Sequence, residues 1–127
     1  MAHAHAGASA LAPESQAVLT KATLSAAKRL GLTNRELSMV LGTSEASISR
    51  LAAGRLFRSS GADTALALLF LRLFRSLDAI VGGDESKARA WLSAPNRHIG
   101  GVPADRIRTI EGLVHVVQYL DAIRGKL

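Results

Sequence analysis

The sequence predicts an all-α fold, and three observations support that class. Apolar residues recur at the three- and four-residue spacing of amphipathic helices, and no segment alternates convincingly with the period of two that marks a strand. Glycines and capping residues separate these segments where helices would begin and end. The 127 residues are 48% hydrophobic, which is enough apolar material for one ordinary core.

Composition also excludes several classes of protein. The chain has no cysteine, which excludes a disulfide framework and a thiolate metal site. The longest uncharged run in the apolar centre, Thr64 to Leu71, is far too short to span a membrane. The amino terminus has neither the basic region nor the long apolar run of a signal peptide. We therefore expect a cytoplasmic protein with no membrane partner.

The amino-terminal elements follow in order. Residues 1–15 are small, alanine-rich and aperiodic, so we expect a disordered arm in which His3 and His5 bind no metal. Residues 16–30 have the apolar spacing of a helix. Thr33 has a glutamate three residues later, the pattern of a capping box, so a second helix should begin there.

A helix-turn-helix is predicted around Gly42. This glycine can supply the positive φ that a sharp reversal needs. Ser44 can cap the helix that follows, and Gly54 can end it. Four apolar residues should meet beneath the turn: Leu37, Leu41, Ile48 and Leu51.

The second of these helices is a candidate recognition helix for DNA. Residues 17–60 hold seven basic and two acidic side chains, a local net charge of +5 that favours a polyanionic partner. Short outward side chains would let the helix sit deep in the major groove, where Arg50 can pair with guanine or a phosphate. Glu45 could accept from a cytosine amine or only favour the helix amino terminus. The alternative is a three-helix packing unit with a solvated outer face. The candidate DNA-binding residues are Arg35, Ser44, Glu45, Ser47, Ser49, Arg50 and Arg55.

The most apolar segment, residues 62–81, should form a helix that is buried on several sides. Its large side chains exceed what one side of a small monomer can cover, so we predict that a second copy covers them in a homodimer. The last helix of the same chain is the alternative cover. The side chains assigned to the interface are Leu66, Leu69, Phe70, Leu73 and Phe74.

The remaining residues should form two helices on either side of a turn-rich loop. Asp84 can cap the first helix, in which Trp91 is expected to anchor the core. Pro103 suits the first turn of a short helical segment, and Thr109 can cap the last helix. Gly112 lies in the first turn of that helix, where glycine is unfavourable, so another backbone or Trp91 should approach it closely.

We assign no catalytic residue and expect no cofactor or metal. His98 and His115 have no paired carboxylate or nucleophile at a recognisable spacing, and the chain has no glycine loop that cradles phosphate. Asn96, Arg97 and His98 form a polar trio that is more typical of a loop at the rim of a protein interface.

Four motifs in the second half carry a resemblance to a known family. They are W-L-x-x-P-N from Trp91, G-G-x-P from Gly100, T-x-x-G from Thr109 and I-R-G from Ile123. With the helix-turn-helix before them, they resemble antitoxins of the Xre/MbcA/ParS family, which belong to RES-Xre type II toxin–antitoxin systems. The resemblance covers residues 16–127.

The resemblance implies a division of labour along the chain. After the arm (1–15), an Xre-like helix-turn-helix (16–60) would bind operator DNA, and a small helical domain (61–127) would dimerise and bind the toxin. The partner would be a cognate RES-domain toxin that consumes NAD, as an NAD-degrading enzyme or an ADP-ribosyltransferase. The antitoxin would block the toxin's active site and repress its own operon. The rival hypothesis is a stand-alone dimeric transcriptional regulator.

On that resemblance, we expect the end of the chain to enter the toxin's NAD site. Gly125 should let the backbone leave the helix, so that Arg124 and Lys126 project at a mobile tip. The alternative is that these basic side chains only complement the helix dipole. The candidate toxin-binding residues are Asn96, Arg97, His98, Arg124, Gly125, Lys126 and Leu127.

Overall fold

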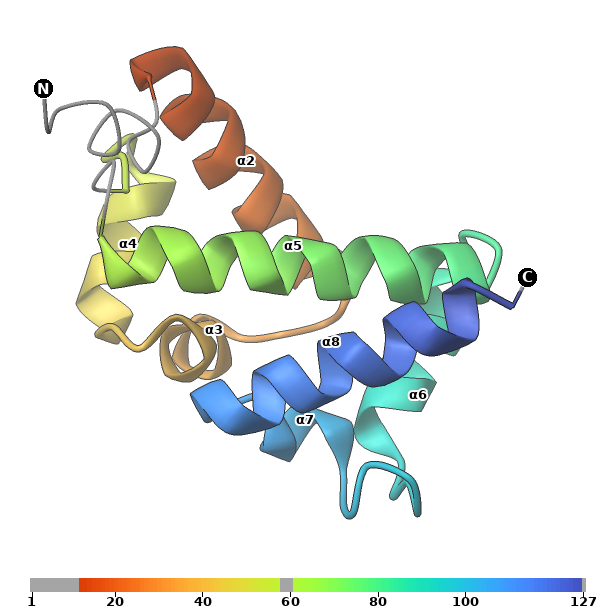
Figure 1. The fold of residues 1–127 in the computed structure, drawn as a ribbon. Coiled ribbons are helices and arrows are strands. Elements are labelled where there is room, and N and C mark those ends of the chain that lie inside the picture. The colour runs from red at the N-terminus through yellow and green to blue at the C-terminus, as the bar shows by residue number, and fades with distance from the viewer. Residues whose placement is uncertain (1–11, 58–60, 127) are drawn as a thin grey trace, which may run out of the picture.

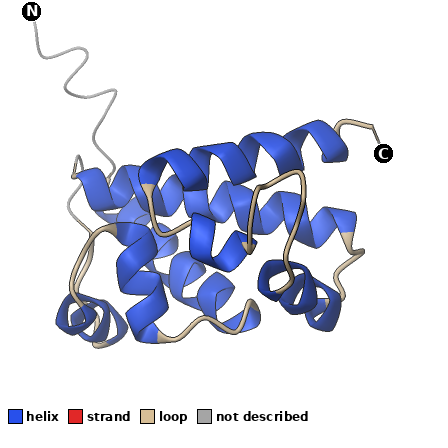
Figure 2. Cartoon of the chain, turned by 90° about the horizontal axis from the view of Figure 1, so that it is seen from below, coloured by secondary structure: helices blue, strands red, loops and turns tan. Residues whose placement is uncertain are grey.

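The computed structural model describes residues 12–57 and 61–126. Within these ranges it contains helices and connecting loops, with one isolated bridge between Asn96 and Gly101 (Figure 1 and Figure 2). The predicted all-α class is confirmed. In chain order the helices are α2 (Pro13–Arg29), α3 (Asn34–Leu41), α4 (Glu45–Ala52), α5 (Ala62–Ile80), α6 (Glu85–Ser93), α7 (Pro103–Arg106) and α8 (Ile110–Arg124).

Helix α5 lies at the centre of the molecule and is shared by both halves of the chain (Figure 1). Helices α2 and α3 pack against it from the amino-terminal half, and α8 packs along it from the carboxy-terminal half. Phe70, Leu73 and Leu77 of α5 have no exposed surface. Because α5 contains neither glycine nor proline, nothing in its sequence bends or interrupts it.

This packing corrects the prediction for the apolar residues of α5. Leu66, Phe70 and Leu73 are buried by helices of the same chain, and Leu69 and Phe74 are partly buried against the same core. A single chain covers these side chains because α2, α3, α6 and α8 all pack against α5. The face that the sequence assigns to a homodimer is therefore an internal face of the monomer.

Four helices begin at the caps that the sequence predicts. Thr33 Oγ1 accepts from the Glu36 N–H at 3.1 Å, and Glu36 Oε1 accepts from the Thr33 N–H at 2.9 Å, which completes the capping box. Ser44, Asp84 and Thr109 each accept from the N–H three residues further on, at 3.1, 3.1 and 3.0 Å. These bonds satisfy backbone donors that the first turn of a helix leaves unpaired.

The amino-terminal part of the described chain differs from the prediction. Helix α2 begins at Pro13 rather than Gln16, so the last three residues of the predicted arm are helical. Proline fits the first turn, where its missing N–H loses no helical bond. Several other residues named above lie outside the described ranges: His3, His5 and Leu127.

Gly112 lies where a side chain cannot fit. A Cβ at this position would overlap the carbonyl oxygen of Arg106 at the end of α7, so the backbone approach predicted for this glycine is confirmed. Trp91 packs against the core as predicted, but it is only partly buried and is not its main anchor. The side chains that anchor the core in this part of the chain are Leu92, Ile99 and Ile107.

Polar and aromatic contacts join α2 to α6. Arg29 Nε lies 3.5 Å from Glu85 Oε2, and Arg89 Nη1 donates to the Arg29 carbonyl at 3.0 Å. The Arg29 guanidinium also lies over the ring of Phe74, 5.9 Å from its centroid. The end of the first described helix is thus fastened to the carboxy-terminal half.

Candidate functional sites

The turn between α3 and α4 has the geometry of a helix-turn-helix. Gly42 has φ +64° and ψ +34°, the left-handed conformation that ends α3. The Thr43 N–H donates to the Ser38 carbonyl at 2.9 Å and closes the turn. The four side chains predicted to meet beneath it are all buried, with exposed fractions of 5% or less: Leu37, Leu41, Ile48 and Leu51.

A short chain of hydrogen bonds orients Arg50 on the outward face of α4. Ser44 Oγ donates to Ser47 Oγ at 3.0 Å, and Arg50 Nη2 donates to the same oxygen at 3.0 Å. Arg50 is exposed, so the rest of its guanidinium faces solvent. An arginine held in this way loses less side-chain freedom on binding than an unrestrained one.

Arg55 and Ser47 lie at the same cavity beside α4. This shallow cavity of about 310 Å³ is formed by Arg55, Ser47, the turn at Gly42 and Thr43, and the beginning of α5. Asp63, which is not among the predicted site residues, also lines it and brings a negative charge. The cavity therefore has one basic and one acidic side chain on its wall.

Three other candidate DNA-binding residues are exposed but stand apart from this group. Glu45 lies in the first turn of α4, Ser49 lies further along it, and Arg35 lies in the first turn of α3. Within the described ranges, no hydrogen bond or ion pair joins any of them to Arg50. The position of Glu45 also suits the positive end of the helix dipole.

Asn96 organises the loop between α6 and α7. Its Oδ1 accepts from the N–H groups of His98 and Ile99 at 2.9 and 3.1 Å, and its carbonyl accepts from Gly100 at 2.9 Å. Ile99 is buried, which anchors the loop to the core. The amide oxygen of Asn96 is thus used within the loop, whereas Arg97 and His98 remain exposed.

Three rings, one each from α6, this loop and α8, form an aromatic stack. Tyr119 of α8 lies 6.4 Å from Trp91 and 5.7 Å from His98, measured between ring centroids, with interplanar angles of 13° and 19°. Tyr119, the chain's single tyrosine, is not among the site residues predicted from the sequence. Partly exposed aromatic rings of this kind are enriched in protein–protein interfaces.

The end of α8 is held against α5 by charged and hydroxyl groups. Arg72 Nη2 lies 2.6 Å from Asp121 Oδ2, and Ser76 Oγ donates to Asp121 Oδ1 at 2.8 Å. Arg124 Nη1 donates to the same serine oxygen at 3.4 Å. The Arg124 side chain therefore folds back onto α5 instead of projecting from the tip.

Helix α8 ends at Arg124, and Gly125 caps it in a right-handed rather than a left-handed conformation. Gly125 has φ −65° and ψ −13°, and its N–H donates to the Asp121 carbonyl at 2.9 Å. The Lys126 N–H then donates to the Ile123 carbonyl at 3.0 Å. Gly125 and Lys126 therefore form a hydrogen-bonded turn that follows α8.

Two structural findings bear on other classes of site. Among the residues that the structure describes, no three His, Asp or Glu side chains are grouped so that they could hold a metal ion. No helix in the same residues is both long and apolar enough to cross a membrane.

Two family models match the chain. The model of the antitoxin Xre-like helix-turn-helix domain matches residues 9–72, and that of the antitoxin Xre/MbcA/ParS C-terminal toxin-binding domain matches residues 76–126. The first match ends within α5 and the second begins within the same helix, so that only three residues of α5 lie between the two matches. No curated protein sequence gives a significant match.

Proposed function

The chain belongs to the antitoxins of the Xre/MbcA/ParS family, and on that basis we propose that it neutralises a RES-domain toxin by blocking its NAD site. We also propose that it represses its own operon through the helix-turn-helix. The observation that carries both proposals is the joint match to an Xre-like helix-turn-helix and a toxin-binding domain in one chain.

In this proposal the first half of the chain binds operator DNA as part of a homodimer. One short recognition helix contacts too few base pairs for specific binding, so helix-turn-helix proteins usually bind two half-sites as two-fold dimers. The oriented Arg50 and the small side chains around it support base contact by α4. Exposed Arg35 and Arg55 would contact phosphates.

In the same proposal the second half binds the toxin through its carboxy-terminal end and the loop between α6 and α7. Residues 125–127 would enter the NAD site, and Arg97, His98 and Tyr119 would contact its rim. A pocket that holds a dinucleotide offers charged and hydrogen-bonding groups to which basic side chains can bind. Substrate would then be excluded by the volume that these residues occupy.

Co-expression tests the function directly. We expect the chain to restore growth to cells that produce the RES-domain toxin encoded beside it, and to co-purify with that toxin. A stand-alone regulator would bind its promoter equally well but would neither rescue growth nor co-purify. Rescue without any loss of NAD consumption by the purified toxin would contradict a block at the NAD site.

Deleting residues 125–127 should weaken toxin binding by at least about tenfold, because these residues would fill the NAD site. Folding should not change, since the buried stripe of α8 ends at Leu120. Calorimetric titration of the toxin and thermal melting measure the two effects. Lys21→Ala is a matched control that removes an exposed charge from α2. If the truncated chain binds the toxin as tightly as the full chain does, a broader surface performs the block.

A further inference from the structure

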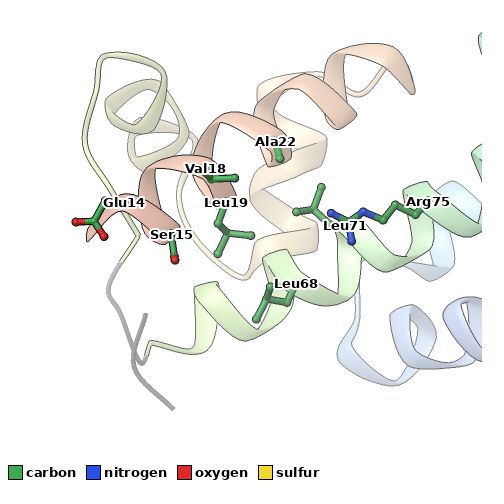
Figure 3. Close-up of a pocket in the computed structure, with 8 residues that line it drawn as sticks. All are labelled: Glu14, Ser15, Val18, Leu19, Ala22, Leu68, Leu71 and Arg75. Carbon is green, nitrogen blue, oxygen red and sulfur yellow. The ribbon is translucent and has the colours of Figure 1, made fainter. Parts of the chain in front are cut away.

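An open apolar groove lies between α2 and α5 on the outside of the molecule (Figure 3). It has a volume of about 350 Å³, and its floor and walls include Val18, Leu19, Leu68 and Leu71. Val18 is 69% exposed and Leu68 is 49% exposed, so two large apolar side chains face water at the same place. Two exposed large apolar side chains that share one hollow offer a surface that a partner can cover.

The groove belongs to neither of the candidate sites described above. Every residue that lines it comes from α2 or α5, and none comes from α3, α4, α6, α7 or α8. A partner seated there would leave the outward face of α4 free for DNA. It would also leave the aromatic stack and the end of α8 free for the toxin.

Opposite charges stand at the two ends of the groove. Figure 3 shows the Glu14 carboxylate at one end and the Arg75 guanidinium towards the other, with the apolar side chains between them. Neither charged group has an ion-pair or hydrogen-bond partner among the residues that the structure describes. When a second copy is related to the first by a two-fold axis across the middle of the groove, its acidic end faces the basic end of the first copy. The two grooves are then complementary in charge.

We propose that a second copy of this chain docks in the groove and forms a two-fold symmetric homodimer. In a two-fold interface, if residue i of one copy contacts residue j of the other, then residue j of the first copy also contacts residue i of the second. Glu14 would therefore pair with the partner subunit's Arg75, and Arg75 with the partner's Glu14. The apolar side chains of both copies would supply the burial, and the two ion pairs would fix the register. The proposal rests on the dimeric operator binding proposed above and identifies its surface.

Sedimentation of the full chain, with neither toxin nor DNA present, tests the surface. We expect the wild-type chain to be dimeric at tens of micromolar. Leu68→Glu should raise the dimer dissociation constant by at least about 100-fold, because it buries a carboxylate in an apolar contact. Leu68 is half exposed in the monomer, so the variant should keep the helical content of the wild type. Ile110→Glu is the matched control, since Ile110 is 61% exposed but lies outside the groove.

A charge exchange tests the two-fold pairing itself. Glu14→Arg and Arg75→Glu should each raise the dissociation constant roughly tenfold, because each turns two attractive pairs into repulsive ones. The double variant should dimerise like the wild type. A mixture of the two single variants should form heterodimers, because both contacts between the two copies then join an arginine to a glutamate. One of these contacts pairs the two substituted side chains, and the other pairs the unchanged Arg75 with the unchanged Glu14.

Three outcomes would overturn the proposal. The first is a wild-type chain that is still monomeric at 200 µM, roughly the concentration at which weak complexes form. The second is a dimer that Leu68→Glu leaves intact. The third is a pair of single charge variants that fail to form heterodimers when mixed. A groove covered by residues 1–11 of the same chain would give the first of these. Growth rescue by the Leu68→Glu chain reports separately on toxin neutralisation, so failure of the surface and failure of the proposed function remain distinguishable.

Discussion

Gly112→Ala is expected to lower the free energy of unfolding by about 3 kcal/mol, at the upper end of the usual cost of overpacking. The new Cβ would overlap the carbonyl oxygen of Arg106 and would lie 2.7 Å from its carbonyl carbon and 3.0 Å from Thr109 Oγ1. The end of α7 and the cap of α8 would therefore have to separate. Thermal melting should show a loss of roughly 10 °C.

Gly125→Ala is the matched control for this prediction. It lies at the other end of α8 in ordinary helical conformation, and its Cβ would lie 3.4 Å from the nearest atom, the Asp121 carbonyl oxygen. Because alanine favours a helix more than glycine does, this variant should be as stable as the wild type or slightly more stable. Equal melting temperatures for the two variants would show that the turn between α7 and α8 yields without strain.

Arg50→Ala is expected to weaken binding to the operator by about 1–3 kcal/mol and to reduce the preference for the operator over other DNA. The loss follows from the position of Arg50 on the outward face of α4, where Ser47 holds its guanidinium ready for a base edge. Gel shifts with the operator and with an unrelated duplex of equal length measure both quantities.

Arg35→Ala and Arg55→Ala provide the comparison. If these residues contact phosphates, each variant should bind all sequences more weakly and should reduce the slope of log affinity against log salt by about one. A double variant of Arg50 and Ser47 that binds the operator as well as the wild type would refute the assignment of α4 as the recognition helix.

The helix-turn-helix could be predicted from the sequence because its signals are local. The capping box at Thr33, the glycine at position 42 and the cap at Ser44 act within a few residues, and each is found in the structure as predicted. The apolar residues beneath the turn follow from helical spacing over fewer than twenty positions. The same reasoning places the caps at Asp84 and Thr109 correctly.

The contacts that were not predicted depend on how distant segments pack. Nothing near Trp91 in the sequence indicates that Tyr119 will lie beside it, because α6 and α8 meet only in the folded chain. The apolar residues of α5 give the quantity of surface to be buried but not its partner, so the covering helices of the same chain could not be told from a second copy. The bond from Arg124 to Ser76 likewise depends on the packing of α8 along α5.

Helix α5 acts as a rigid spacer between the two proposed partners. Its 19 residues span about 28 Å, with α4 towards one end and the end of α8 towards the other (Figure 1). A toxin bound to α8 would therefore lie at a fixed angular position around the axis of the DNA to which α4 binds. Since B-DNA turns once in about 10.5 base pairs, adding about five base pairs between two whole operators, each bound by one dimer, would move the toxins of one dimer to the opposite side of the double helix. The helical phasing of the operators would thus decide which bound toxins become neighbours.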